Sequence, residues 1–208
     1  MLLCGCPDPD TDPPADAGPD GHVTCPFPYL GDPSKPVVVT PLVLGADGTS
    51  EELVDGGDVP LIFPPQGGRV AFLGARAQNL DPCAIRISGT MRDTQTKQVT
   101  FDVRTINLRP AADGWGESVD ADYNSFSNIP VCPNNWASKN AYDESFELEL
   151  TVTDRKKRSG TVKVSGIPRC AEPDKEVACK CICKVDYVTG EPCGDPDAGV
   201  DGGGGGGS

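Results

Sequence analysis

Apolar and polar residues alternate most regularly in the stretch FELELTVT, residues 146–153. Phe146, Leu148, Leu150 and Val152 would point to one side, and the Glu and Thr residues between them to the other. A period of two is typical of a β-strand that buries one face against a core and exposes the other to water. The pattern therefore predicts a half-buried strand over residues 146–153.

Turn residues separate further runs of this type. The segment 154–160 (DRKKRSG) would connect the strand 146–153 to a partner at 161–165, and a second hairpin is expected between 84–93 and 98–108. In the later strand of that second hairpin, one face would carry Val99, Phe101, Val103 and Thr105. The remaining expected strands cover residues 37–40, 41–44, 59–63 and 69–80.

These strands, together with the lack of a clear helical period, predict an all-β protein. The expected architecture is an antiparallel β-sandwich of the immunoglobulin or fibronectin type, with a disulfide-rich C-terminal extension. A longer connection over 110–140 would carry Trp115 and Trp136, which are expected to act as packing plugs.

Composition divides the chain into five expected parts. They are a truncated signal or lipobox-like segment at 1–6, a disordered acidic Pro-rich tether at 7–24, a β-sandwich domain at 25–170, a Cys-rich segment stapled to that domain at 171–193, and a disordered Gly-rich tail at 194–208.

The first residues, MLLCGC, place Leu3, Cys4 and Gly5 directly before Cys6. This order resembles the lipobox of bacterial lipoproteins, although Cys4 stands where that motif has a small or hydroxylated residue and no basic and apolar stretch precedes it. The resemblance implies lipid attachment at Cys6. It also implies a secreted, extracytoplasmic protein of the bacterial cell envelope or surface, such as an outer-membrane lipoprotein with one immunoglobulin-like domain. The alternative is an arbitrary chain end with two incidental cysteines.

The acidic charge is concentrated at the two ends. The formal net charge is −13, and residues 1–20 hold five Asp while residues 194–208 hold three, with no Lys or Arg in either stretch. The rest of the chain therefore carries −13 + 8 = −5. This balance argues against nucleic acid as a partner.

Calcium binding by the Asp residues of the tether is a further hypothesis, but the Gly and terminal Glu of the standard calcium loop are missing.

Ten cysteines in 208 residues indicate an oxidising compartment. Eight remain once Cys4 and Cys6 are set aside, and we expect them in disulfides: Cys25, Cys83, Cys132, Cys170, Cys179, Cys181, Cys183 and Cys193. If CKCIC (179–183) is extended, each of its three cysteines must pair with one of the other five. A thiolate cluster for zinc or copper(I) is the alternative.

Familiar catalytic devices are missing from the sequence. The single His, His22, lies in the expected tether, where it could not be held in register with a nucleophile. A P-loop and a G-x-G-x-x-G motif after a strand are both absent, so no cofactor is expected. We therefore expect a protein that is not an enzyme.

Two loops carry candidate ligand-binding residues. Asp120, Asp122 and Asn124 occupy alternate positions, like the first ligands of a calcium loop, although Ser125 replaces the expected Gly. The basic run Arg155, Lys156, Lys157 and Arg158 could contact anionic glycans or lipid head groups, or could be a solvated hairpin tip.

The sequence thus predicts a non-enzymatic, lipid-anchored cell-surface protein that presents a disulfide-stabilised β-sandwich for binding or envelope structure. Its partners would be the membrane, through the lipid anchor, and a glycan or protein ligand. The alternative is a secreted carboxylate- or metal-dependent hydrolase with its site in the 110–145 connection, where Asp and Glu residues gather.

Overall fold

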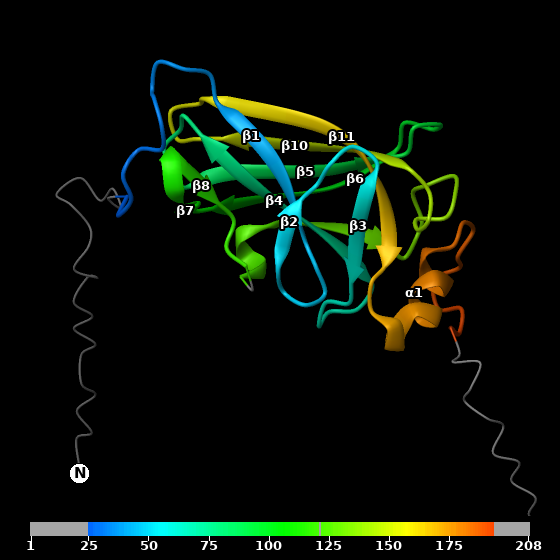
Figure 1. Cartoon of the computed structure of the whole chain (residues 1–208). Helices are drawn as coiled ribbons and strands as arrows, with labels where there is room; N and C mark the ends of the chain where they lie inside the picture. The colour runs from blue at the N-terminus through cyan, green and yellow to red at the C-terminus, as the bar shows by residue number, and fades with distance from the viewer. Residues whose placement is uncertain (1–24, 121, 194–208) are drawn as a thin grey trace, which may run out of the picture.

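A computed structural model describes residues 25–120 and 122–193. The predictions for the lipobox-like start, the tether and the Gly-rich tail lie outside these residues. The described chain is mostly strands, arranged as one curled sheet with a short helix at its C-terminal side (Figure 1). The strands are β1 (Val38–Leu44), β2 (Ser50–Glu52), β3 (Gly57–Ile62), β4 (Arg69–Gln78), β5 (Ile85–Arg92), β6 (Val99–Ile106), β7 (Arg109–Pro110), β8 (Trp115–Glu117), β9 (Ser127–Cys132), β10 (Phe146–Thr153) and β11 (Ser159–Cys170).

The two predicted hairpins are confirmed. In β10, the side chains of Phe146, Leu148, Leu150 and Val152 are buried while the residues between them are partly exposed. β10 pairs antiparallel with β11 and β5, and β5 pairs antiparallel with β6. The alternation of apolar side chains therefore places this sheet on the core, as the sequence indicated.

The sheet is mixed, so the prediction that all strands pair antiparallel is wrong. Its strand order is β2-β1-β4-β3-β11-β10-β5-β6, with β8 and β9 also paired to β4 and β7 paired to β8. The described strand pairs are antiparallel except for one. In that pair β3 runs parallel to the second half of β11, from Gly166↔Gly57 to Cys170↔Leu61. β11 extends beyond its pairing with β10, which ends at Phe146↔Gly166, and the extra length pairs with β3 instead.

Gly166 lies where β10, β11 and β3 meet. A Cβ atom there would lie 2.6 Å from Leu148 Cδ1 and 2.7 Å from Val59 Cγ2. Only a residue without a side chain lets these two buried side chains approach the β11 backbone so closely.

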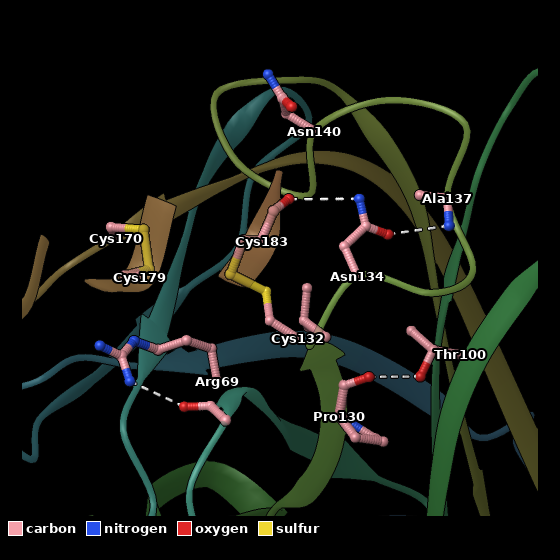
Figure 2. The surroundings of a disulfide bond; sticks show 12 residues. Arg69, Thr100, Pro130, Cys132, Asn134, Ala137, Asn140, Cys170, Cys179 and Cys183 are labelled. Carbon is pink, nitrogen blue, oxygen red and sulfur yellow. Dashed lines mark hydrogen bonds between the residues drawn. A yellow bond between two sulfur atoms is a disulfide. The ribbon is translucent and has the colours of Figure 1, made fainter. Parts of the chain in front are cut away.

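Side-chain hydrogen bonds connect the last strand of the order, β6, to β9. Thr100 Oγ1 donates to Pro130 O at 2.6 Å, as Figure 2 shows, and Ser127 Oγ donates to Asp102 O at 2.9 Å. Asn128 N donates to Asp102 Oδ2 at 2.8 Å. We call this contact the β6–β9 seam, and it curls the sheet back toward itself.

The orientation of β6 follows from this seam. Its alternate residues Thr100 and Asp102 face β9, so Val99, Phe101 and Val103 point outward and are 39%, 59% and 36% exposed. These residues share a face, as predicted, but it is the outer face and not the core face.

The two Trp residues have different surroundings. Trp136 packs on the main core, donates its indole N–H to Val131 O at 2.9 Å, and lies 5.4 Å from the Phe146 ring. The predicted packing role therefore fits Trp136. Trp115 lies in β8 with the Arg76 guanidinium carbon 4.9 Å from its ring centroid.

The C-terminal segment contains a helix, α1 (Glu176–Cys183), so the assumption of an extended CKCIC is wrong. An ion pair between Lys180 and Glu176, one turn apart at 2.6 Å, supports the helix. One turn also separates Cys179 and Cys183, which are both buried. Among the described residues no helix has the length and apolarity needed to cross a membrane.

The eight cysteines form four disulfides, Cys25–Cys83, Cys132–Cys183, Cys170–Cys179 and Cys181–Cys193. Each cysteine of CKCIC thus pairs outside that motif, as expected, but the segment is helical and not extended. In α1, Cys183 pairs with the end of β9 and Cys179 with the end of β11. Cys181 pairs with Cys193 in the segment that follows the helix. Figure 2 shows the Cys132–Cys183 and Cys170–Cys179 bridges side by side at the edge of the sheet. The disulfides indicate an oxidising, extracytoplasmic setting.

Candidate functional site

A groove of about 700 Å³ lies between the end of β3, β4, β9 and the loop before β9. Volumes of this size, with apolar and aromatic walls and a few polar groups, are typical of ligand sites. Below, "the groove" means the concavity lined by Ile62, Phe63, Pro64, Pro65, Gln66, Gly67, Val70, Phe72, Arg104, Tyr123, Asn124, Asn128 and Pro130.

The floor of the groove is the top of a small apolar cluster separate from the main core. Phe72 and Ile62 are buried there, Val70 packs against them, and Phe126 lies beneath. Ile62 and Val70 are directly paired across β3 and β4, so the sheet itself holds the floor.

One wall is the turn PPQGG (64–68) together with Phe63. Gly67 closes the turn by donating its N–H to Pro64 O at 3.0 Å, with a φ of 91° that favours Gly. Phe63 is 43% exposed, and its backbone N–H donates to Glu172 Oε2 at 2.7 Å. The wall is therefore tied to the Cys-rich segment.

Arg69 braces this wall from below. Its guanidinium carbon lies 4.9 Å from the Phe63 ring centroid, and its nitrogens donate to Gly68 O at 2.9 Å and Lys175 O at 3.1 Å. The side chain is buried and its Nε has no partner among the described atoms. Burial lowers the pKa of Arg69, while the nearby Glu172 carboxylate acts in the opposite direction.

Another part of the lining is Tyr123, in a short 3-10 helix (Tyr123–Ser125). Asp122 caps this helix by accepting the Asn124 N–H at 3.1 Å. Tyr123 is 47% exposed, and its ring packs on the Phe72 ring at a centroid distance of 5.0 Å. Two partly exposed rings, Phe63 and Tyr123, thus line the groove.

The polar groups along the groove include one ion pair. Arg104 Nε donates to Asp102 Oδ2 at 2.8 Å. With the Asn128 amide turned to satisfy its neighbours, its oxygen accepts from Arg104 Nη2 at 3.0 Å and its nitrogen donates to Tyr123 O at 3.1 Å. The Gln66 and Asn124 side chains are exposed at the rim.

The three calcium candidates have different neighbours. Asp120 Oδ1 accepts the Ser50 N–H at 3.0 Å and also contacts the Ser50 hydroxyl. Asp122 caps the 3-10 helix, and Asn124 lines the groove. Within residues 25–120 and 122–193, the one grouping of three His, Cys, Asp or Glu ligand atoms is Cys25, Asp81 and Cys83, and its two sulfurs already form a disulfide.

The basic run lies at the tip of the β10–β11 hairpin. Arg155 pairs with Asp81 at 2.6 Å, and Arg158 donates to the Tyr29 hydroxyl and to Lys35 O. Lys156 and Lys157 are exposed. Two of the four bases therefore fasten the hairpin tip to its neighbours, which leaves only the two lysines directed at solvent.

The carboxylates of the 110–145 connection go to separate places. Asp143 pairs with Arg169, whereas Glu117 and Asp120 line a second cleft of about 420 Å³ near the C-terminal end of β4, around Arg76. That cleft also contains Glu51, Glu52, Arg76 and Arg109.

Of the residues that line the groove, sequence reasoning singled out Asn124, as a calcium candidate, but neither of the two exposed rings. A Phe before a Pro-Pro turn and a Tyr after an Asp cap were available signals for Phe63 and Tyr123, but only the fold brings these rings, 60 positions apart, to one concavity. Comparison with protein-family models, curated proteins and solved structures finds no match for this chain.

Proposed function

We propose that this chain is a non-enzymatic, lipid-anchored cell-surface protein whose disulfide-stabilised β-domain binds a ligand in the groove. The observation that carries the proposal is the groove itself, because exposed Phe63 and Tyr123 rings line a concavity of about 700 Å³. Rings that remain partly exposed in a concave site offer a large contact area to a ligand.

The proposed location rests on the disulfides and on the lipobox resemblance of the first residues. Four bridges suit a domain that matures outside the cytosol, and acylation of Cys6 would hold it at the bacterial envelope. The tether would then separate the domain from the membrane. An immunoglobulin-like or fibronectin-like arrangement of the strands belongs to the same proposal, supported by the β10–β11 and β5–β6 hairpins.

Intact-mass analysis of the protein isolated from its native membrane tests the location. We expect a chain that begins at an acylated Cys6 and gains about 8 Da on reduction, two for each of four bridges. An unmodified, soluble N-terminus would contradict the anchoring, and no mass change on reduction would contradict the oxidising compartment.

The second cleft favours a second candidate function, a carboxylate-dependent hydrolase. Glu117 lies in register with Arg76 on β4 and with Arg109 on β7, so one carboxylate stands between two cations on neighbouring strands. If this cleft is catalytic, Glu117→Gln abolishes hydrolysis of a chromogenic glycoside or ester panel while binding at the groove is unchanged. Lack of any hydrolysis by the wild type removes this candidate.

A further inference from the structure

We propose that the groove binds a neutral oligosaccharide, an inference that rests on the binding function proposed above and names its ligand class. Four features of the groove favour such a ligand: the exposed rings, the free hydrogen-bonding groups at the rim, the charge of the lining and the fixed walls.

The rings supply the apolar contacts. Phe63 and Tyr123 are 43% and 47% exposed, whereas Phe72 between them is buried at the floor. A pyranose ring has an apolar face made of C–H groups, which stacks on an aromatic side chain and removes both surfaces from water. Two rings in one groove suit a ligand with more than one sugar unit.

The rim supplies groups for sugar hydroxyls. Within the described residues no hydrogen bond engages the side-chain amides of Gln66 and Asn124 or the hydroxyl of Tyr123, and all three side chains line the groove. An amide offers both a donor and an acceptor, as does a phenol. Adjacent hydroxyls of a sugar, which also donate and accept, match this set.

The charge of the lining favours a neutral ligand. Among the described residues that line the groove, none is acidic and Arg104 is the one base, which is paired with Asp102 at 2.8 Å. An anionic ligand would have to compete with Asp102 for the guanidinium, and a cationic ligand would have no carboxylate in the lining. The acidic Pro-rich segment 7–24 of this chain, which could also lie along an aromatic groove, is disfavoured for the same reason.

The walls are already held in place. Phe63 is fixed by Glu172 and Arg69, and Tyr123 by Phe72 and the Asp122 cap. Little side-chain and loop entropy is then lost when a ligand binds. This matters for carbohydrates, whose contacts are individually weak.

The test is titration calorimetry of the full chain, purified with its disulfides intact. The neutral probes are maltohexaose, cellohexaose, mannohexaose and chitohexaose, and the comparison probes are hexagalacturonate and a synthetic peptide of residues 7–24. We expect at least one neutral hexasaccharide to bind. Tyr123→Ala and Phe63→Ala should each weaken its Kd about tenfold or more, and Tyr123→Phe by less, because the ring remains.

Phe101→Ala is the matched control, because this ring is 59% exposed on the outer face of β6 and outside the groove. Its Kd should equal that of the wild type. The inference is overturned if none of the neutral probes binds, if only hexagalacturonate or the peptide binds, or if binding is insensitive to Tyr123→Ala. If only hexagalacturonate or the peptide binds, chemical-shift changes at the Gln66 and Asn124 amides would show that the groove still binds a ligand. The proposed function would then survive, although the neutral-oligosaccharide inference would not.

Discussion

Asp93 is a buried carboxylate whose hydrogen bonds connect two loops. Its side chain is 0% exposed, and Oδ1 accepts the Gln95 N–H at 2.8 Å and the Thr96 N–H at 3.4 Å. Oδ2 accepts both the N–H and the hydroxyl of Ser138, each at 2.7 Å. Asp93 thus joins the β5–β6 turn to the loop between β9 and β10.

The substitution Asp93→Asn keeps the shape of the side chain but replaces one acceptor oxygen with an NH2 group. In either orientation of the amide, the NH2 group would face two donors, which are the two N–H groups of the turn or the N–H and hydroxyl of Ser138. Those two donors would then have no acceptor. An unsatisfied buried donor costs about 1–3 kcal/mol, and hydrogen bonds to a charged group are the stronger kind. We expect Asp93→Asn to lower the free energy of unfolding by about 3 kcal/mol.

The measurement is urea unfolding at neutral pH, followed by Trp fluorescence with the disulfides intact. Asp55→Asn is the matched control, because Asp55 also accepts the N–H and hydroxyl of a serine, Ser165, but is exposed to solvent. The control should lose less than about 1 kcal/mol, since water can replace the lost bonds. Equal losses in the two variants would refute the argument that burial sets the cost.

Three further predictions concern pH, the disulfides and the β6–β9 seam. Burial raises the pKa of Asp93, but the hydrogen bonds from its neighbours outweigh this effect and hold the pKa below its ordinary value. The ionised Asp93 therefore stabilises the folded state fully above a pH of about 4, and this contribution is lost as the pH falls further. The stability gap between wild type and Asp93→Asn in urea should therefore narrow from pH 6 to pH 3, and a constant gap would contradict this. Replacing both Cys132 and Cys183 with Ala opens a loop with a sequence separation of 51 and should cost about 4 kcal/mol in the same assay, with a loss under about 1 kcal/mol counting against it. Thr100→Val, which removes a seam hydrogen bond, should cost about 1 kcal/mol, whereas Thr151→Val, between strands that are also paired through their backbones, should change little.

Local patterns predicted the local parts of this fold. The alternation in FELELTVT identified β10, and the turn residues around it identified its hairpin with β11. The parallel pairing of β3 with β11 joins residues about 110 positions apart and depends on a Gly that admits Leu148 and Val59, which no periodicity reveals.

The C-terminal helix and the groove were missed for different reasons. In CKCIC the cysteines occupy every second position, which is compatible with a strand, but bridges to β9 and β11 and the Glu176–Lys180 pair favour a helix. The groove required the spatial meeting of Phe63 and Tyr123, whereas the loops chosen from sequence, Asp120–Asn124 and the basic run, mostly bind their own neighbours.

The parallel β3–β11 pair has a consequence for how the domain is built during export. β3 emerges early, yet part of its edge stays open until the last long strand and the helix after it have arrived, and Cys132 waits for Cys183 in the same way. A chain released segment by segment would hold an open β-edge and free thiols until nearly its whole length is outside. The sheet and the Cys132–Cys183 bridge can therefore be completed only after the C-terminal part of the domain has reached the compartment where disulfides form.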